Sequence, residues 1–393
     1  MSQKHILVVN SGSSSVKLGV FEGDKRLFKG AFERVGAQSC SHRIEDDQGN
    51  VLSEGPVPSE SAVPSYSDCI KFFVARLCEL GVRFDAVGHR VVHGGLSFEQ
   101  PILIDDEAFE SLRRLEPLAP LHQPYNLAGV KACAEALPGI PQIACFDTAF
   151  HSGRPIETRR YAIPHRFAEK GVMAYGFHGL SYEHVSSKFE EAFGHRKRSK
   201  VVVCHLGNGS SVCAVQDGKG VSSSMGFTAL EGVPMGTRCG NIDPGVLLYL
   251  LQQEGMTPEE LADVLYKKSG LLGVSELSSD VRDLEKAAAD GHEGALRALA
   301  LFGERIAEQV LKMAQAMRGI EGLVFTAGIG ENSALVRELV CSKLEWLGLR
   351  LDPKANAEHQ TIVSYPSSSL TVCVIPTDEE GVIARHADRL AFA

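Results

Sequence analysis

The stretch HILVVNSGSSSVKLGVF at residues 5–21 decides the fold. Four β-forming residues at 6–9 form the short apolar run typical of a buried strand, and Val16, Leu18 and Val20 alternate with Lys17 and Gly19 as in a second strand. Small residues at 10–15 could surround an anion, with Lys17 adding a positive charge. The stretch therefore predicts a phosphate-binding hairpin, with an ordinary hairpin and polar turn as the alternative. The G-x-x-x-x-G-K-[ST] spacing of a Walker loop does not occur here.

Length and composition narrow the class of protein. A chain of 393 residues is long enough for two domains, and its net charge of −9 argues against a broad nucleic-acid-binding face. Ten cysteines without a C-x-x-C pair are typical of reduced core residues. The sequence shows neither an N-terminal leader pattern nor an apolar run of about 18 residues, so we expect a cytoplasmic protein that does not cross a membrane.

Strands and helices alternate along the first half of the chain, which predicts an α/β fold. The polar segment 37–67 reads as an excursion or edge structure with one short possible strand, and Ser67 is expected to cap a helix that stops at Gly81. Buried strands are predicted at 84–95 and 140–146, the second ending at Asp147. Helices are expected at 107–115 and from residue 124 to about Leu137.

The second half repeats the first. Residues 200–220, KVVVCHLGNGSSVCAVQDGKG, again predict strand, small-residue turn and strand, and Gly218 corresponds to Gly23 at the end of each hairpin. Two copies of one hairpin indicate two related domains. A capping box at Thr257 should start a helix that ends at Gly270, a long helix should cover 295–317, and the last strand, at 370–375, should precede a terminal helix. After a strand at 322–325, the glycine turn TAGIGEN at 326–332 is expected to open another helix, an arrangement that directs backbone N–H groups at an anion.

Nine motifs give a more specific resemblance because they occur together and in one order. They are NSGSSSVK (10–17), GHRVVHGG (88–95), APLH (119–122), FDTAFH (146–151), YGFHGLS (175–181), HLGNG (205–209), MGTR (235–238), TAGIGEN (326–332) and PTDEE (376–380). This set resembles the acetate kinase, or acetokinase, family of short-chain carboxylate kinases. The resemblance implies two duplicated RNase H-like domains of the superfamily that includes sugar kinases, chaperones and actin, with a cleft between them.

The resemblance also implies an activity. It is the reversible ATP-dependent phosphorylation of acetate to acetyl phosphate, with release of ADP, by direct in-line transfer, a step of acetyl-CoA biosynthesis. Implied domains are residues 1–147 with 381–393, which would carry the carboxylate-kinase part, and residues 148–380, which would bind nucleotide. A propionate or other short-chain carboxylate kinase is the alternative, and an ATPase switch of the actin or chaperone type is a further one. The family suggests a homodimer with small-molecule substrates.

Catalytic roles carry over motif by motif. Arg90 and Arg238 would clamp the carboxylate and the transferring phosphoryl group, because a guanidinium matches planar oxyanions in a bidentate way. His178 would donate a hydrogen bond to the transition state, and Asp147 would act near the reacting oxygens. Acetate is already ionised at pH 7 and needs no general base, so orienting an arginine or Mg²⁺ is the favoured role for Asp147. Salt bridges for the arginines and a structural role for the histidine are the alternatives.

Other implied contacts concern metal, nucleotide and substrate. Asn10 and Glu379 would hold Mg²⁺ or Mn²⁺, with Glu380 open as a substitute for Glu379. The nucleotide contacts would be Ser13, Ser15, Lys17, His205, Leu206, Gly207, Asn208, Gly209, Asp280, Val281, Arg282, Gly328, Ile329, Gly330, Glu331 and Asn332. A salt bridge at a helix start competes with the nucleotide role of Asp280 and Arg282. Val92, Leu121 and Ala229 would line the pocket for the methyl group of acetate.

Three positions depart from the family's usual pattern. Asn241 replaces an aspartate that follows the Gly-Thr-Arg motif, and Leu96 replaces a glutamate. Ala229 replaces a proline of the substrate pocket, and its smaller bulk would admit a longer acid such as propionate. One methylene in an apolar pocket changes discrimination by roughly 1–3 kcal/mol, so the choice among acetate, propionate and butyrate stays open.

Overall fold

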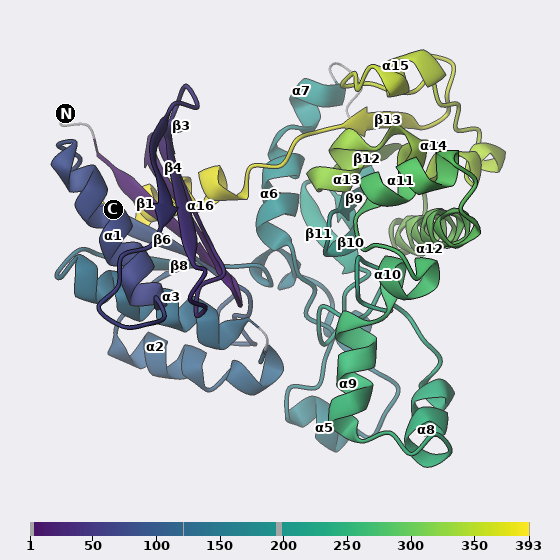
Figure 1. Ribbon diagram of the computed structural model, residues 1–393. Helices are drawn as coiled ribbons and strands as arrows, with labels where there is room; N and C mark the ends of the chain where they lie inside the picture. The colour runs from purple at the N-terminus through teal and green to yellow at the C-terminus, as the bar shows by residue number, and fades with distance from the viewer. Residues whose placement is uncertain (1–3, 121, 194–198, 393) are drawn as a thin grey trace. The chain divides into compact units, whose positions relative to one another are not determined.

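The structure, a computed structural model, describes residues 4–120, 122–193 and 199–392 (Figure 1). The chain divides into two compact units. Unit 1 comprises Met1–Ser152 and Asp378–Ala393, and unit 2 comprises Gly153–Thr377. In the described part of the chain, no helix has the length and apolar character needed to cross a membrane.

Unit 1 is built on an eight-stranded mixed sheet in the order β5-β4-β3-β2-β1-β6-β8-β7. Strands β1, β6 and β8 run parallel to one another, and β2 to β5 extend the sheet as an antiparallel meander. Its elements are β1 (Ile6–Ser11), β2 (Ser15–Glu22), β3 (Lys25–Glu33), β4 (Ser41–Asp46), β5 (Val51–Pro56), α1 (Tyr66–Glu79), β6 (Ala86–Val91), β7 (Ile102–Leu103), α2 (Asp106–Arg113), η1 (Glu116–Leu118), α3 (Gln123–Ala136), β8 (Gln142–Phe146), η2 (Ala149–His151) and α16 (Glu379–Ala391).

Helices cover both faces of this sheet. Leu7, Val9 and Val87 pack in one apolar cluster with residues of α1 and α3. Gly88, the next residue after Val87 in β6, faces Ile383 of α16 instead. Because neighbouring residues of a strand point to opposite faces, α3 and α16 lie on opposite sides of the sheet. The parallel strands are therefore buried on both faces, which explains the continuous apolar run at 6–9.

Unit 2 is built on a five-stranded sheet in the order β11-β10-β9-β12-β13. The long helix α12 packs on one face of it, against a cluster that includes Val202, Phe302 and Phe325. Its elements are α4 (Ile156–Arg159), α5 (His165–Glu169), α6 (Gly179–Ser187), α7 (Phe189–Phe193), β9 (Lys200–Leu206), β10 (Ser210–Gln216), β11 (Lys219–Ser223), α8 (Pro244–Gln252), α9 (Pro258–Lys267), α10 (Gly270–Ser275), α11 (Val281–Ala289), α12 (Glu293–Met317), β12 (Gly322–Thr326), α13 (Ala327–Asn332), α14 (Ala334–Ser342), η3 (Glu345–Leu347), α15 (Pro353–Ala357) and β13 (Thr371–Val374).

The two sheets share one topology. In each sheet, three consecutive antiparallel strands form a meander, and two later strands add in parallel on the side of its first strand. The corresponding strands, in order, are β1, β2, β3, β6 and β8 in unit 1 and β9, β10, β11, β12 and β13 in unit 2. The first turn of each copy spans three residues, 12–14 and 207–209. Gly23 and Gly218 both take a positive φ at the second turn. The predicted duplicated α/β fold is therefore confirmed.

Several local predictions were wrong. Residues 41–56, expected as an excursion or edge structure with one short possible strand, form two strands, β4 and β5, at one edge of the sheet. Ser65 rather than Ser67 caps α1, because Ser65 and Asp68 form the capping box. The helix begun by the Thr257 capping box ends at Lys267, and Gly270 starts the next helix. The glycine turn at 326–332 is itself helical, as α13.

The close contact between β6 and α16 gives a test of this packing. A methyl group on Gly88 would lie 2.5 Å from Cγ2 of Ile383 and 3.2 Å from its carbonyl oxygen. We expect Gly88→Ala to lower the free energy of unfolding by about 1–3 kcal/mol, measured by urea denaturation, because the helix must move. Gly153→Ala is the control, since nothing lies within 4 Å of the added methyl. Equal effects of both substitutions would contradict the described contact.

Candidate functional site

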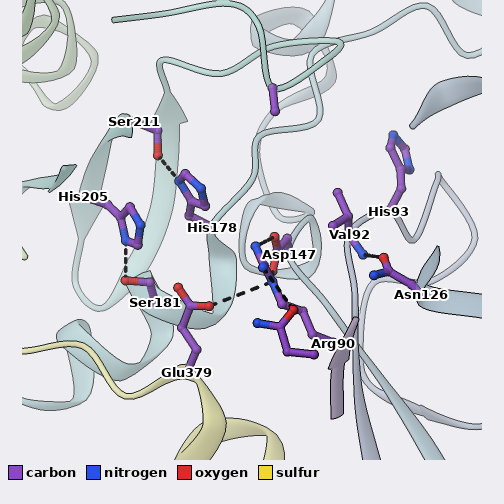
Figure 2. A network of polar contacts seen from close by, with 12 residues as sticks. Arg90, Val92, His93, Asn126, Asp147, His178, Ser181, His205, Ser211 and Glu379 are labelled. Atoms are coloured by element: carbon purple, nitrogen blue, oxygen red, sulfur yellow. Dashed lines mark hydrogen bonds and ion pairs between the residues drawn. The ribbon is translucent and has the colours of Figure 1, made fainter. Parts of the chain in front are cut away.

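Polar side chains gather at one edge of the unit 1 sheet. Asn10 and Arg90 lie at the carboxyl ends of β1 and β6, and Asp147 directly follows β8. These three strands are parallel neighbours, so their carboxyl ends meet at the same edge, where open α/β sheets bind ligands. Glu379, the first residue of α16, lies beside them (Figure 2).

Arg90 is the centre of this group (Figure 2). Its Nε donates to Oδ1 of Asp147 over 3.1 Å, and its Nη2 donates to Oδ2 over 2.6 Å. Nη1 reaches Oδ1 of Asn10 at 3.4 Å, and Oε2 of Glu379 lies 3.9 Å from Nε. The Asp147 side chain is only 2% exposed, whereas that of Arg90 is 21% exposed. A buried carboxylate therefore fixes a guanidinium that still reaches solvent.

Negative charge on Glu379 is only partly offset by the positive side chains near it. Burial alone would lower the pKa of Arg90, but Asp147 and Glu379 more than compensate and raise it. Burial raises the pKa of Glu379, as do the charges of Asp147 and Glu380, against the opposing effect of Arg90 and Lys17. Carboxylate charge at Glu379 is thus incompletely compensated by the protein, so an added cation would be favoured there.

The available oxygen atoms suit a metal ion that takes only some of its ligands from the protein. Glu379 offers carboxylate oxygens and Asn10 an amide oxygen, and Mg²⁺ commonly takes one or two carboxylates while water and phosphate fill its other positions. Among the described residues no cluster of three or more His, Cys, Asp or Glu could form a closed metal cage. Glu380 instead accepts a hydrogen bond from Nη1 of Arg26 at 3.2 Å. Of the two glutamates, the geometry favours Glu379 for the metal.

The turn of the first hairpin lies next to this group. Lys17 on β2 pairs in register with Asn10, and Ser13 and Lys17 are exposed while Ser15 is half-buried. The backbone N–H of Gly12 donates to the carbonyl of Ser15 at 2.8 Å, and Gly12 does not take a positive φ. This N–H is therefore used within the turn, and the seryl hydroxyls and Lys17 are the groups that could face an anion.

Sequence reasoning missed Asn126 of α3. This residue is 4% exposed, and its Oδ1 accepts the N–H of Val92 at 3.0 Å while its Nδ2 donates to the carbonyl of Ser11 at 2.7 Å. It thereby joins the ends of β1 and β6. Val92, predicted to line the substrate pocket, is buried beside it, and the predicted partner Leu121 lies outside the described residues. A single asparagine in a helix gives no sequence signal for this role.

His178 and Arg238 approach one turn of unit 2. A methyl group on Gly209 would lie 3.6 Å from Nε2 of His178 and 3.8 Å from Nη1 of Arg238. Nδ1 of His178 forms a 2.8 Å hydrogen bond with Oγ of Ser211 (Figure 2). Nη1 of Arg238 donates to the carbonyl of Ala229 at 2.9 Å. The structure therefore brings together two residues that lie 60 positions apart in the sequence.

A pocket of about 880 Å³ opens beside the same turn, and its size suits a nucleotide. It is lined by Gly207, Asn208, Ser279, Asp280, Val281, Arg282, Glu285, Gly328, Ile329, Asn332 and Ser333. Most of the predicted nucleotide contacts of unit 2 are in this set, and sequence reasoning missed Ser279, Glu285 and Ser333. The predicted contacts His205, Leu206, Gly209, Gly330 and Glu331 are not among the described lining residues.

The helix-start salt bridge considered for Asp280 and Arg282 is present in the structure. Asp280 caps α11 by accepting the N–H of Arg282 at 2.9 Å, and it also accepts from the guanidinium of Arg282. The same two residues line the pocket. Because the Arg282 side chain is 88% exposed, the ion pair contributes little to stability and leaves the arginine available to a ligand.

Two of the departures from the family pattern can be placed. Oδ1 of Asn241 accepts the N–H of Gly232 at 2.9 Å, and the Asn241 N–H donates to the carbonyl of Gly232 at 2.8 Å. An aspartate could accept the same bond, so the substitution keeps the loop that follows Arg238 while removing a negative charge. Leu96 is 49% exposed and does not belong to the core.

Known proteins resemble this chain along nearly its whole length. The model of the acetokinase family matches residues 5–385. An acetate kinase of Thermotoga maritima is 44% identical over 403 residues, with 98% of each chain covered. The crystal structure of a propionate kinase from Francisella tularensis matches with a TM-score of 0.91 at 36% identity, covering 98% of this chain and 100% of that one. The crystal structure of Porphyromonas gingivalis acetate kinase matches with a TM-score of 0.89 at 38% identity, covering 98% and 99%.

The pairing of Arg90 with Asp147 predicts a large cost when the carboxylate is removed. Asp147→Ala would leave a partly buried guanidinium without its bidentate partner, and we expect the free energy of unfolding to fall by about 2–4 kcal/mol, reduced from the fully buried case because Arg90 reaches solvent. Glu110→Ala breaks an exposed ion pair with Arg113 in the same unit and should cost at most about 1 kcal/mol. Urea denaturation of both variants measures the difference, and similar values would show that Asp147 does not stabilise Arg90.

Proposed function

This chain belongs to the acetokinase family, and from that membership we propose that it phosphorylates acetate with ATP, giving acetyl phosphate and ADP by reversible in-line transfer. The observation that carries the proposal is the fixed guanidinium of Arg90 at the edge of the unit 1 sheet. The nucleotide-sized pocket of unit 2 supplies a place for ATP. Unit 1 is the proposed carboxylate-kinase part and unit 2 the proposed nucleotide-binding part.

Binding of the acceptor, the carboxylate of acetate, is assigned to Arg90. Phosphoryl transfer depends on positioning the acceptor and on neutralising charge, with little covalent chemistry for the protein. Asp147 uses both its oxygens on Arg90, so its proposed role is to orient the guanidinium. This role fits the chemistry, because an ionised acetate attacks without first losing a proton. The fixed guanidinium then offers its solvent-facing side to the carboxylate or to the transferring group.

A metal is assigned to Glu379 and Asn10. The raised pKa of Glu379 and its carboxylate neighbours support a cation at this position, and Mg²⁺ or Mn²⁺ with ATP is the proposed form. When bound, the metal would neutralise phosphate charge. Lys17 and the hydroxyls of Ser13 and Ser15 lie on the neighbouring hairpin and are proposed phosphate contacts.

Arg238 and His178, two residues of unit 2, are the proposed contacts of the phosphoryl group during transfer. Arg238 and His178 both approach Gly209, which is adjacent to the pocket residue Asn208. The carbonyl of Ala229 orients the guanidinium of Arg238, and Ser211 orients the ring of His178. Fixed donors of this kind stabilise developing charge without reorganising during the reaction.

Acetate is favoured over propionate as the substrate because the family and the relative from Thermotoga maritima carry that name. The similar structure from Francisella tularensis is named a propionate kinase, which keeps propionate as the second candidate. Ala229 in place of the family's usual proline is consistent with either acid. An ATPase switch of the actin or chaperone type is less favoured, because the group around Arg90 suits the binding of an acceptor carboxylate, which such a switch would not need.

A second copy of the chain is the proposed partner. Helix α8 is strongly apolar, yet none of its residues is buried, and Val246, Leu248 and Tyr249 are 39%, 54% and 53% exposed. Exposed apolar patches of this kind mark interaction surfaces, and the family suggests a homodimer. We propose that α8 contributes to the dimer interface. A cytoplasmic location is also proposed, supported by ten cysteines, all among the described residues, that form no disulfide and are mostly buried, and cell fractionation would test it.

The activity is tested by trapping acyl phosphate with hydroxylamine in the presence of ATP, Mg²⁺ and a series of C2 to C4 acids. Acetate should give the highest kcat/KM, and little ATP should be hydrolysed when no acid is present. Arg238→Ala should reduce the signal by about 10²-fold or more, since it removes a charged donor to the transferring group. Chelation of Mg²⁺ should also abolish product formation.

Arg305→Ala is the control for Arg238→Ala, because Arg305 forms only an exposed pair with Glu308. It should retain full activity. A higher kcat/KM for propionate than for acetate would show that propionate is the preferred substrate. Hydrolysis of ATP at the same rate with and without an acid would support the ATPase switch and overturn the kinase proposal.

The dimer is tested by light scattering coupled to gel filtration. Two chains of 42.4 kDa give an expected mass of 84.8 kDa. Leu248→Glu places a charge on the exposed face of α8 and should shift the mass toward that of the monomer. Leu296→Glu changes another exposed leucine, 49% exposed on α12, and should leave the mass unchanged. A monomeric wild-type chain would refute the proposed interface.

A further inference from the structure

The carboxylate of Glu331 joins two segments of unit 2. Its Oε1 accepts the N–H of Ala327 at 2.8 Å and the N–H of Thr377 at 3.1 Å. Ala327 begins α13 with a φ of 64°, a conformation that costs a non-glycine residue of the order of 1 kcal/mol or more. The contact therefore holds a strained residue at the start of the helix that carries the pocket residues Gly328, Ile329 and Asn332.

Thr377 continues this connection through its side chain. Its hydroxyl donates to Oγ of Ser181 at 2.9 Å, and the same Oγ forms a 2.8 Å hydrogen bond with Nδ1 of His205. Ser181 is completely buried and His205 is 7% exposed. Buried hydrogen bonds are costly to break, so these contacts fix the orientation of the His205 ring.

The His205 ring in turn supports His178. The two rings stack with centroids 4.1 Å apart and planes 24° apart (Figure 2). His178 takes a φ of 57° at the N-cap of α6, and Ser181 lies in the first turn of that helix. A strained backbone persists only where its surroundings impose it. Two sides of His178 are thus held, one by Ser211 and the other by the ring of His205.

We propose that Glu331 and Thr377 are positioning residues that connect the pocket helix α13 to His178 through Ser181 and His205. Glu331 then acts by holding two backbone N–H groups, in place of the direct nucleotide contact that the resemblance implies. The proposal rests on the proposed kinase function, because the quantity that these residues set is the position of His178 during phosphoryl transfer. A small displacement of such a group reduces the rate while leaving the pocket itself intact.

A connected series of contacts does not by itself establish coupling, so the test must measure it. Thr377→Val removes the hydroxyl and keeps the shape, Thr377→Ser keeps the hydroxyl, and Ser181→Ala removes the same hydrogen bond from its other end. Ser186→Ala is the matched control, since Ser186 lies in the same helix and its hydroxyl donates to the carbonyl of Tyr182, outside this series. For each variant we would measure kcat, the KM for acetate and for ATP, ADP binding by calorimetry, and the midpoint of thermal unfolding.

Thr377→Val and Ser181→Ala should each lower kcat by roughly 10-fold or more, with ADP affinity within about 3-fold of wild type. Thr377→Ser should restore most of the rate, and Ser186→Ala should match wild type. The double variant should be no slower than Ser181→Ala alone, because Ser181→Ala already removes the hydrogen bond that Thr377→Val breaks, together with the bond to His205. Should Thr377→Val fail to fold, Ser181→Ala is judged by the same criteria.

Two results would overturn the inference. One is an unchanged kcat in Thr377→Val and Ser181→Ala, and the other is a double variant whose loss equals the product of the single losses. These results are distinct from a failure of the proposed function, which would appear as a wild-type protein that makes no acyl phosphate with any acid although it binds ADP.

Discussion

The bidentate pairing of Arg90 with Asp147 constrains the rest of unit 1. A charged group at the end of a buried strand is costly unless it has a partner, and Asp147 supplies one from the neighbouring parallel strand. That requirement fixes which strands can be neighbours, since β6 and β8 must end level with each other. It also places Asn10 and Glu379 next to the guanidinium, from β1 on one side and from the last helix of the chain on the other.

Because the topology is duplicated, the parallel strands of each unit end at an equivalent edge of the sheet, but the residues at the two edges differ. In unit 1 the strand ends carry Asn10, Arg90 and Asp147, and the result is a compact group of charges. In unit 2 the corresponding ends of β9 and β12 are Leu206 and Thr326, which lead into a glycine turn and a short helix. Small residues there leave room for a pocket of about 880 Å³. One fold thus places a compact group of charged side chains in one copy and a pocket in the other.

The elements that could be predicted are those whose signal is local. The apolar runs at 6–9 and 201–206 are buried strands, and the repeat of the hairpin reflects the shared topology. For strands β4 and β5 only edge structure with one short possible strand was expected, because their alternation is largely polar, with Arg43, Glu45 and Glu54 on an exposed face. Asn126 and Ser333 could not be found either, since each depends on contacts between distant segments. The motifs located most of the pocket, but only the coordinates separate Glu379, which faces Arg90, from Glu380, which faces Arg26.

The turn at 326–332 shows why the resemblance locates residues better than it assigns their roles. Its glycines and the preceding strand predict backbone N–H groups directed at a bound anion, yet the first of these N–H groups is satisfied by the carboxylate of Glu331 within the same helix. A helix start that is already paired with a carboxylate gains little from a second anion, because the two negative charges would repel. In the proposed function, phosphate recognition would then depend on side chains and on the turn at 207–209. The Glu331 carboxylate holds the strained residue Ala327 at the start of α13, so the role proposed for Glu331 is exerted through the backbone.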